Sequence, residues 1–161
     1  MKTIFLDRDG IVNTELGDYV MNMADFEIHK PVIPFLKKAT EMGFSVVIIT
    51  NQAGIAKGLY GHELVREQHD LVKKIFIREG INLLESYYCP HHPDYSDCLC
   101  RKPKSLLIEK AIARFGTDKP SSLMIGDKLR DVESAQGAGI KGFQVISNPS
   151  YETLMSLILE R

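Results

Sequence analysis

Short apolar runs alternate with amphipathic stretches along this chain. Residues 44–50, FSVVIIT, form a nearly continuous apolar and largely β-branched run, which is typical of a strand buried on both faces of a parallel sheet. Weaker runs predict further strands at residues 3–6, 84–88, 121–127 and 142–147. Apolar residues at helical spacing predict helices from Pro31 to Gly43 and at residues 62–79, 105–115, 131–137 and 151–160. Residues 10–30 have no clear period and are expected to form a loop or small flap.

The alternation of strands and helices predicts an α/β fold of three layers, with a doubly wound parallel sheet and helices on both faces. We expect residues 1–161 to form a single domain. Such sheets place their chemistry beyond the carboxyl ends of the strands. Three polar clusters follow predicted strands: DRDG at 7–10, TNQ at 50–52 and GDKLRD at 126–131. They are therefore expected to meet at one edge of the sheet.

Composition narrows the class of protein. The 161 residues are 44% apolar and carry a formal net charge of -1, which argues against a nucleic-acid partner. No segment reaches the roughly 18 apolar residues of a membrane span. Acids at positions 7 and 9 interrupt the apolar run that a signal peptide would need, so we expect a soluble, cytoplasmic protein. Without heptads or a large apolar patch, a monomer is the default expectation.

The first polar cluster has the residues for phosphoryl transfer. Asp7 and Asp9 lie two positions apart, so in extended backbone their carboxylates point to the same side. Together with Asp127 from another strand end they could hold Mg²⁺ through oxygen ligands. A carboxylate that shares a metal with a phosphate can attack phosphorus and form an aspartyl-phosphate. Asp9 could then protonate the leaving alkoxide and later deprotonate the attacking water.

The other clusters supply groups for a phosphate. Thr50 and Asn51 offer a hydroxyl, an amide and backbone N–H groups, while Lys102 and Lys128 are candidate counter-charges. Asp131 is expected to orient a lysine or a metal-bound water rather than to ligate the metal. Each cluster alone also fits an ordinary turn or helix cap. Their occurrence at three successive strand ends favours phosphoryl transfer.

Every cysteine of the chain lies in one short loop, CPHHPDYSDCLC. Three thiols and one imidazole, with two ligands at each end of the loop, suit a tetrahedral zinc ion that pinches the loop shut; the ligands listed by position are Cys89, His91, Cys98 and Cys100. Four protein ligands leave no position for a catalytic water. Three free cysteines in a buried turn are the alternative, and His92 could replace His91. The zinc would project Arg101 and Lys102 into the phosphate site.

The stretches FLDRDG, TNQAGIAKG, CPHHP, CLCRKP and GDKLRD resemble the haloacid dehalogenase-like (HAD) phosphatase superfamily. Within it they are most similar to the branch of D-glycero-D-manno-heptose 1,7-bisphosphate phosphatases and histidinol-phosphate phosphatases. The resemblance runs from residue 4 to residue 131. It implies Asp7 as nucleophile, Asp9 as acid and base, and Mg²⁺ on Asp7, the Asp9 main-chain carbonyl and Asp127. It also implies Thr50 and Lys102 as phosphate binders, and it favours His91 over His92.

The same resemblance assigns substrate contacts. The residues it points to are Arg8, Glu15, Asn51, Gln52, Ala53, Arg101 and Lys128. Residues 15–18 and Tyr19 match the segment that lines the substrate entrance, although ELGDY is one residue longer than the usual pattern. Ala53 stands where a serine often follows TNQ. Only residues 8–49 separate Asp7 from Thr50, and a helix and a strand use about half of them. No cap domain is therefore expected.

The resemblance leaves two substrates open, because the residues named above hold the phosphate or the metal that both share. A heptose 1,7-bisphosphate is the first expectation and histidinol phosphate the alternative. The sequence disfavours two non-enzyme interpretations, which are a zinc-containing nucleic-acid module and a phospho-receiver domain. The neutral charge opposes the first. In a receiver domain the phosphorylated Asp ends a middle strand, where this chain has Thr50.

Overall fold

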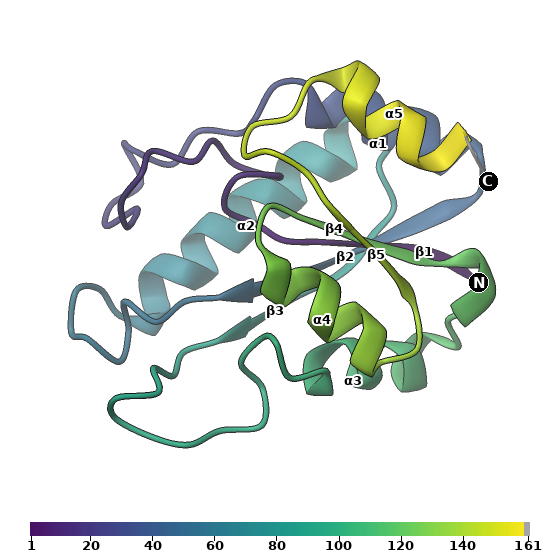
Figure 1. The fold of residues 1–161 in the computed structure, drawn as a ribbon. Coiled ribbons are helices and arrows are strands. Elements are labelled where there is room, and N and C mark those ends of the chain that lie inside the picture. The colour runs from purple at the N-terminus through teal and green to yellow at the C-terminus, as the bar shows by residue number, and fades with distance from the viewer. Residues whose placement is uncertain (160–161) are drawn as a thin grey trace.

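A single parallel sheet forms the centre of the computed structural model, which describes residues 1–159 (Figure 1). The strand order is β3-β2-β1-β4-β5, and every neighbouring pair is parallel. The strands are β1 (Lys2–Leu6), β2 (Phe44–Asn51), β3 (Leu83–Cys89), β4 (Leu123–Gly126) and β5 (Lys141–Gln144). Because all five run in one direction, their carboxyl ends share one edge of the sheet.

Helices cover both faces of the sheet (Figure 1). One face carries α1 (Val32–Glu41), α2 (His62–Arg78) and α5 (Tyr151–Leu159). The other carries α3 (Leu106–Phe115) and α4 (Leu129–Gly137), and a short 3-10 helix, η1 (Lys119–Ser121), precedes β4. The predicted three-layer α/β fold is confirmed. No helix among the described residues combines the length and apolar character that a membrane span requires.

Alternate residues of the central strands face opposite layers. In β1, Ile4 and Leu6 pack in the cluster beneath α1, α2 and α5, whereas Phe5 packs against α3 and α4. In β2, Ile48 and Ile49 divide in the same way. All of these side chains are fully buried, which explains why the strands are apolar without alternation.

Several element boundaries differ from the sequence-based expectation. The strand expected at 121–127 is shorter, because residues up to Ser121 form η1 and Asp127 lies beyond the strand end. The strand expected to reach residue 147 ends at Gln144. The helix expected from residue 131 begins at Leu129, where the Lys128 backbone N–H donates to Asp131 Oδ2 over 3.0 Å. The last helix was expected to reach residue 160, which lies outside the described residues.

Residues 7–43 connect β1 to β2 without a separate folded lid. Within residues 1–159 this connection contains only the expected irregular segment, residues 10–30, followed by α1. The segment is anchored, because Val12 and Phe26 are buried in the main core and the Glu15 backbone N–H donates to Asn148 Oδ1 over 2.8 Å. The predicted absence of a cap domain is confirmed for the described residues, so the carboxyl edge of the sheet stays open.

Candidate active site

The carboxyl edge of the sheet gathers three carboxylates and one lysine, which we call the sheet-edge cluster: Asp7, Lys102, Asp127 and Asp131. Asp7 follows β1 and Asp127 follows β4, the neighbouring strand. Asp131 comes from the first turn of α4. Carboxylate oxygens of the three acids lie within 4.8 Å of one another. The expected meeting of separate polar clusters at one edge is therefore observed.

Lys102 is the single cation inside this cluster. Its side chain is 1% exposed, and its Nζ lies 2.8 Å from Asp7 Oδ1 and 2.7 Å from Asp131 Oδ1. The same Nζ donates to the Ile49 carbonyl over 2.7 Å. Burial acts to lower the pKa of Lys102, but Asp7 and Asp131 outweigh burial and raise it above its ordinary value. Asp131 thus contacts a lysine, as expected from the sequence.

Asp7 lies in an environment that resists its charge. Burial, with contributions from Asp131 and Asp9, raises the pKa of Asp7 to about 7, although Lys102 acts to lower it. One oxygen, Oδ1, accepts from the Arg8 backbone N–H over 2.8 Å as well as from Lys102. A divalent cation beside this carboxylate would offset the repulsion and favour its charged form.

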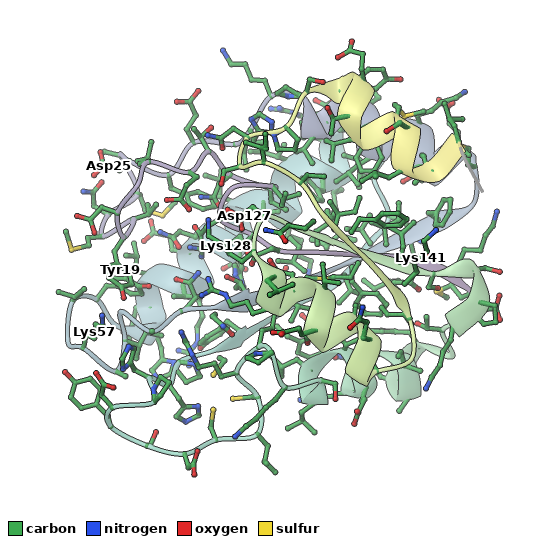
Figure 2. All side chains as sticks on the ribbon, viewed as in Figure 1. Tyr19, Asp25, Lys57, Asp127, Lys128 and Lys141 are labelled. Atoms are coloured by element: carbon green, nitrogen blue, oxygen red, sulfur yellow. The ribbon has the colours of Figure 1, made fainter. Side chains whose placement is uncertain are left out.

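Asp127 has one oxygen free for a ligand. Its Oδ2 accepts from Lys128 Nζ over 2.8 Å and from Ser147 Oγ over 2.6 Å. Its Oδ1 is buried and has no hydrogen-bond partner among the described residues. An unpartnered carboxylate oxygen beside Asp7 fits the hard oxygen ligands that Mg²⁺ prefers. Figure 2 shows Asp127 and Lys128 side by side.

The turn after Asp9 depends on Gly10. Its φ is +89°, a conformation that L side chains rarely adopt. A Cβ at this position would lie 2.7 Å from Asp127 Oδ2. Glycine therefore lets the chain leave β1 in close contact with the carboxylate of the next strand.

Asp9 is held as a carboxylate by three neighbours. It accepts from Arg8 Nη2 over 3.0 Å, from Asn13 Nδ2 over 3.0 Å and from Gln52 Nε2 over 2.8 Å. Burial acts to raise the pKa of Asp9, but Arg8 and the hydrogen bonds bring it below its ordinary value. Arg8 is itself 1% exposed, and its Nη1 donates to Gln68 Oε1 over 2.6 Å. The Arg8 guanidinium therefore links Asp9 to α2, and it also lies 5.2 Å from the ring centroid of Phe26.

The TNQ cluster is tied into the same network. Gln52 Nε2 donates to Thr50 Oγ1 over 2.9 Å as well as to Asp9, and Tyr60 donates its hydroxyl to Gln52 Oε1 over 2.7 Å. Asn51 clamps the backbone of Lys102, since its Oδ1 accepts from the Lys102 N–H over 3.0 Å and its Nδ2 donates to the carbonyl over 3.1 Å. The Gln52 amide therefore fixes the side chains of Thr50 and Asp9, and the Asn51 amide fixes the backbone of Lys102.

A cleft of about 270 Å³ opens beside Asp9. Its walls come from the turn after β1, the 10–30 segment, the end of β2 with the loop that follows it, and the start of α4; the lining residues are Arg8, Asp9, Glu15, Gly17, Asp18, Tyr19, Val20, Asn51, Gln52, Tyr60 and Arg130. Figure 2 shows Tyr19 and Lys57 together on one side of the molecule, away from Asp127. The cleft leads from the surface to Asp9.

The loop from Cys89 to Pro103, which we call the cysteine loop, brings four soft donors together. Their donor atoms all lie within 4.8 Å of one another. Cys89 Sγ lies 3.7 Å from Cys98 Sγ and 3.1 Å from Cys100 Sγ, and His91 Nδ1 lies 3.3 Å from Cys100 Sγ. Ligands of a tetrahedral zinc would be about 3.8 Å apart for zinc–sulfur bonds of about 2.3 Å. The three thiols and one imidazole therefore fit zinc.

His92 does not share this cluster. Its Nδ1 accepts from the Asp94 backbone N–H over 3.2 Å, and its ring packs against Tyr95 with centroids 5.8 Å apart. The four residues that come together include His91 instead. The alternative that His92 replaces His91 is therefore not supported by the geometry.

Comparisons with known proteins agree with this arrangement. The HAD-hydrolase-like family model matches residues 99–153. A D-glycero-alpha-D-manno-heptose-1,7-bisphosphate 7-phosphatase of Photorhabdus laumondii is 38% identical over 146 residues, covering 87% of this chain and 79% of that protein. The chain belongs to the D-glycero-D-manno-heptose-1,7-bisphosphate 7-phosphatase family. A Helicobacter pylori phosphatase of this family, for the beta anomer, is 38% identical and covers 92% of this chain and 86% of its own length.

A solved structure from the heptose-bisphosphate phosphatase family has the same fold. The D,D-heptose 1,7-bisphosphate phosphatase from B. bronchiseptica, complexed with magnesium and phosphate, is 29% identical and superposes with a TM-score of 0.84. The match covers 98% of this chain and 87% of that one. The likeness extends over nearly the whole chain and includes the carboxyl edge of the sheet.

The predicted family residues fall into two groups by position. Arg8, Asp9, Glu15, Asn51 and Gln52 line the cleft. The others do not line it. Thr50, Ala53, Lys102 and the acids that follow β1 and β4 are buried. Lys128 is half-exposed but paired with its carboxylate neighbour, and Arg101 turns back so that its Nη1 donates to the His91 carbonyl over 3.2 Å.

Several residues of the network were not predicted, among them Ser147, which donates to Asp127. Asn13 and Gln68 contact Asp9 and Arg8, while Tyr60 and Arg130 line the cleft. Arg130 lies within the GDKLRD motif at residues 126–131, so its position in the motif could have indicated a role in the site. Gln68 and Tyr60 lie in an ordinary amphipathic helix and the loop before it, where nothing local distinguishes them from surface residues.

Proposed function

We propose that this protein is a Mg²⁺-dependent phosphatase that removes the 7-phosphate of a D-glycero-D-manno-heptose 1,7-bisphosphate through an aspartyl-phosphate on Asp7. One observation carries the chemistry: a buried Asp7 paired with Lys102 lies beside an oxygen of Asp127 that has no hydrogen-bond partner within residues 1–159. The cluster combines a nucleophile, a counter-charge and a metal ligand.

In the first step, an oxygen of Asp7 attacks the phosphorus. The new bond to the Asp7 oxygen forms as the bond to the sugar oxygen breaks. Asp9, which lines the cleft, donates a proton to the leaving alkoxide. Its hydrogen bonds favour the carboxylate in the free site. An approaching phosphate, itself negative, raises the proton affinity of Asp9 and opposes those bonds.

In the second step, water hydrolyses the aspartyl-phosphate. Asp9 accepts the proton of the attacking water, and phosphate leaves as Asp7 is regenerated. The fixed position of Asp9 between Asn13 and Gln52 keeps its oxygens in place for both transfers. Lys102 balances charge on the phosphoryl group in both steps, without moving, because Asp131 and the Ile49 carbonyl hold its Nζ.

Two metals accompany this mechanism. Mg²⁺ would be held by Asp7, Asp127 and the main-chain carbonyl of Asp9, where it supplies positive charge to the phosphoryl oxygens. Zinc would be held by the four donors of the cysteine loop, where it has a structural role. Its effect would be to hold the loop whose tail delivers Lys102 to Asp7 and whose Arg101 donates back to the His91 carbonyl.

The substrate follows from the family. Relatives that cover most of this chain are named for both the alpha and the beta anomer of the heptose bisphosphate. Phosphate release should be measured with both anomers, with histidinol phosphate and with p-nitrophenyl phosphate, with and without Mg²⁺. Highest kcat/KM on a heptose bisphosphate is expected. Faster turnover of histidinol phosphate would reject the substrate and retain the chemistry.

The sequence-based expectations of one domain, a monomer and a cytoplasmic location complete the proposal. The one continuous sheet of the described residues supports a single domain. A single peak of monomer mass in light scattering is the expected result for the purified protein.

A further inference from the structure

We propose that Arg130 binds the second, unreacted phosphate of the substrate and so makes the site prefer a bisphosphate. This inference rests on the proposed function and deepens it. Arg130 is the second residue of α4, lines the cleft and is not among the residues already assigned to the metal or the transferred phosphate.

The cleft has room for the body of the substrate on one side of Asp9. The seven-carbon chain separates the two phosphates of a heptose 1,7-bisphosphate, so they cannot both occupy the sheet-edge cluster. With the 7-phosphate beside Asp7, the remainder of the molecule must extend past Asp9 into the cleft. Asn51 and Gln52 line it on the side of β2, and Glu15, Asp18 and Tyr19 line the part formed by the 10–30 segment.

The charges of the cleft leave one cation available. Arg8 lines it too, but Arg8 is 1% exposed and paired with Asp9. Glu15 and Asp18 are acidic and would repel a phosphate. Arg130 forms no ion pair with any carboxylate of the described residues, and its Nε is buried without a hydrogen-bond partner. A buried donor without a partner is costly, and a bound phosphate would satisfy it.

The backbone of Arg130 is fixed next to the reacting groups. Asp131, the next residue, pairs with Lys102 and also accepts from the Lys128 backbone N–H. The Asp131 backbone N–H in turn donates to the Lys128 carbonyl over 3.0 Å. The first turn of α4 is thus tied to the sheet-edge cluster, and a guanidinium anchored there can make paired hydrogen bonds to a phosphate.

Other nearby cations are placed less well. Lys128 is bound to Asp127, and Arg101 donates to the His91 carbonyl. Lys57 is exposed and does not line the cleft; its Nζ lies 5.2 Å from the ring centroid of Tyr19 (Figure 2). Because Tyr19 lines the cleft, Lys57 is the other cation that could bind the second phosphate, and an experiment must distinguish it from Arg130.

The test compares two substrates that differ only in the second phosphate, D-glycero-D-manno-heptose 1,7-bisphosphate and the 7-monophosphate. In Arg130→Gln, KM for the bisphosphate should rise roughly tenfold to a hundredfold, while KM for the monophosphate and kcat for both change less than about threefold. Arg130→Lys should retain part of the preference. Lys57→Gln and the distant Arg78→Gln should keep the preference of the unmodified protein.

Three kinetic results would overturn the proposal. One is an equal loss on both substrates, which would assign Arg130 to the transferred phosphate or to folding. The second is no loss on either substrate. The third is a preference lost in Lys57→Gln and retained in Arg130→Gln. The melting temperature of Arg130→Gln should stay within about 2 °C of the unmodified protein, because no described contact is removed.

A binding measurement keeps this inference separate from the proposed function. Calorimetry on Asp7→Asn should show tighter binding of the bisphosphate than of the monophosphate, and the difference should vanish in Asp7→Asn/Arg130→Gln. Equal binding of both ligands by Asp7→Asn rejects the role of Arg130. If the unmodified protein binds the bisphosphate preferentially, loses this preference in Arg130→Gln and releases no phosphate, the proposed function fails and the role of Arg130 stands.

Discussion

The sheet-edge cluster and the cysteine loop both gather metal-binding side chains, but they are built in opposite ways. The cluster draws on residues from position 7 to position 131, each 7% exposed or less, and regular elements hold its acids. The cysteine loop draws its four donors from residues 89–100, of which three are only partly buried. Strand ends and a helix position the acids of the first site, whereas the second lies in a loop that a bound zinc would hold in shape.

The two regions meet at Lys102. Its backbone belongs to the cysteine loop and is clamped by Asn51, while its Nζ lies in the sheet-edge cluster. A disturbance of the loop should therefore reach the chemistry through one residue. Four substitutions test this division, in order of decreasing effect on kcat/KM.

The largest effect is expected from Asp7→Asn. Without the nucleophile, kcat/KM should fall by roughly a thousandfold or more in phosphate-release assays. Thermal unfolding should show little loss of stability, because the change removes a carboxylate that burial and Asp131 disfavour. Asp97→Asn, at a fully exposed loop position, serves as the control. Full activity in Asp7→Asn would reject the aspartyl-phosphate mechanism.

Lys102→Met should come next. It leaves Asp7 and Asp131 buried without their cation, so unfolding should become easier by about 3 kcal/mol and kcat/KM should fall roughly a hundredfold. Chemical denaturation and steady-state kinetics measure the two effects. Adding Asp131→Asn should restore part of the stability but not the activity. Lys74→Met, at an exposed position of α2, should change neither.

Cys98→Ser tests the loop by itself. Zinc content, measured by elemental analysis, should fall, and the melting temperature should drop with it. KM should rise by about tenfold, with a smaller change in kcat, because a loosened loop positions Lys102 less precisely. Ser96→Ala is the matched control in the same loop. Loss of zinc with unchanged KM would separate the loop from the phosphate site.

The smallest effect is expected from Asn51→Ala. It removes two hydrogen bonds to the Lys102 backbone, so stability should fall by about 1–2 kcal/mol and kcat/KM by roughly threefold to tenfold. The control is Asn82→Ala, whose amide bonds Ser45 away from the site. If both variants lose stability but neither loses activity, the clamp on Lys102 has no functional role.

The same division explains what the sequence could predict. Asp7 and Asp127 follow recognisable strands, and the parallel sheet brings these strand ends together, as its topology requires, whereas Lys102 stands in a local motif of the cysteine loop. The four loop ligands were visible because they are close in sequence. In each case the signal was local and the geometry followed from the fold class.

Contacts between distant segments could not be predicted. Gln68 reaches Arg8 from the middle of α2, and Tyr60 reaches Gln52 across a turn, but neither position has an unusual local pattern. The ion pair between Arg8 and Asp9 could not be predicted either, because neighbours in sequence pair only in certain rotamers, and burial in the folded protein selects these rotamers. Helix α4 begins two residues before the expected position, because the Asp131 carboxylate accepts from the Lys128 backbone N–H at the helix start. The sequence suggested only a functional role for Asp131, so this capping role was not predicted.

Gly10 places a limit on how this site can change over generations. Every single-nucleotide missense change of a glycine codon introduces a residue with a Cβ, and here that atom would press on the Asp127 carboxylate while its backbone holds a φ of +89°. No single missense change at this position avoids both effects. Gly17 and Gly58 share a positive φ, but nothing lies within 4 Å of their added Cβ. A substitution at Gly17 or Gly58 would therefore cost backbone strain alone, whereas a substitution at Gly10 would add a steric clash with Asp127.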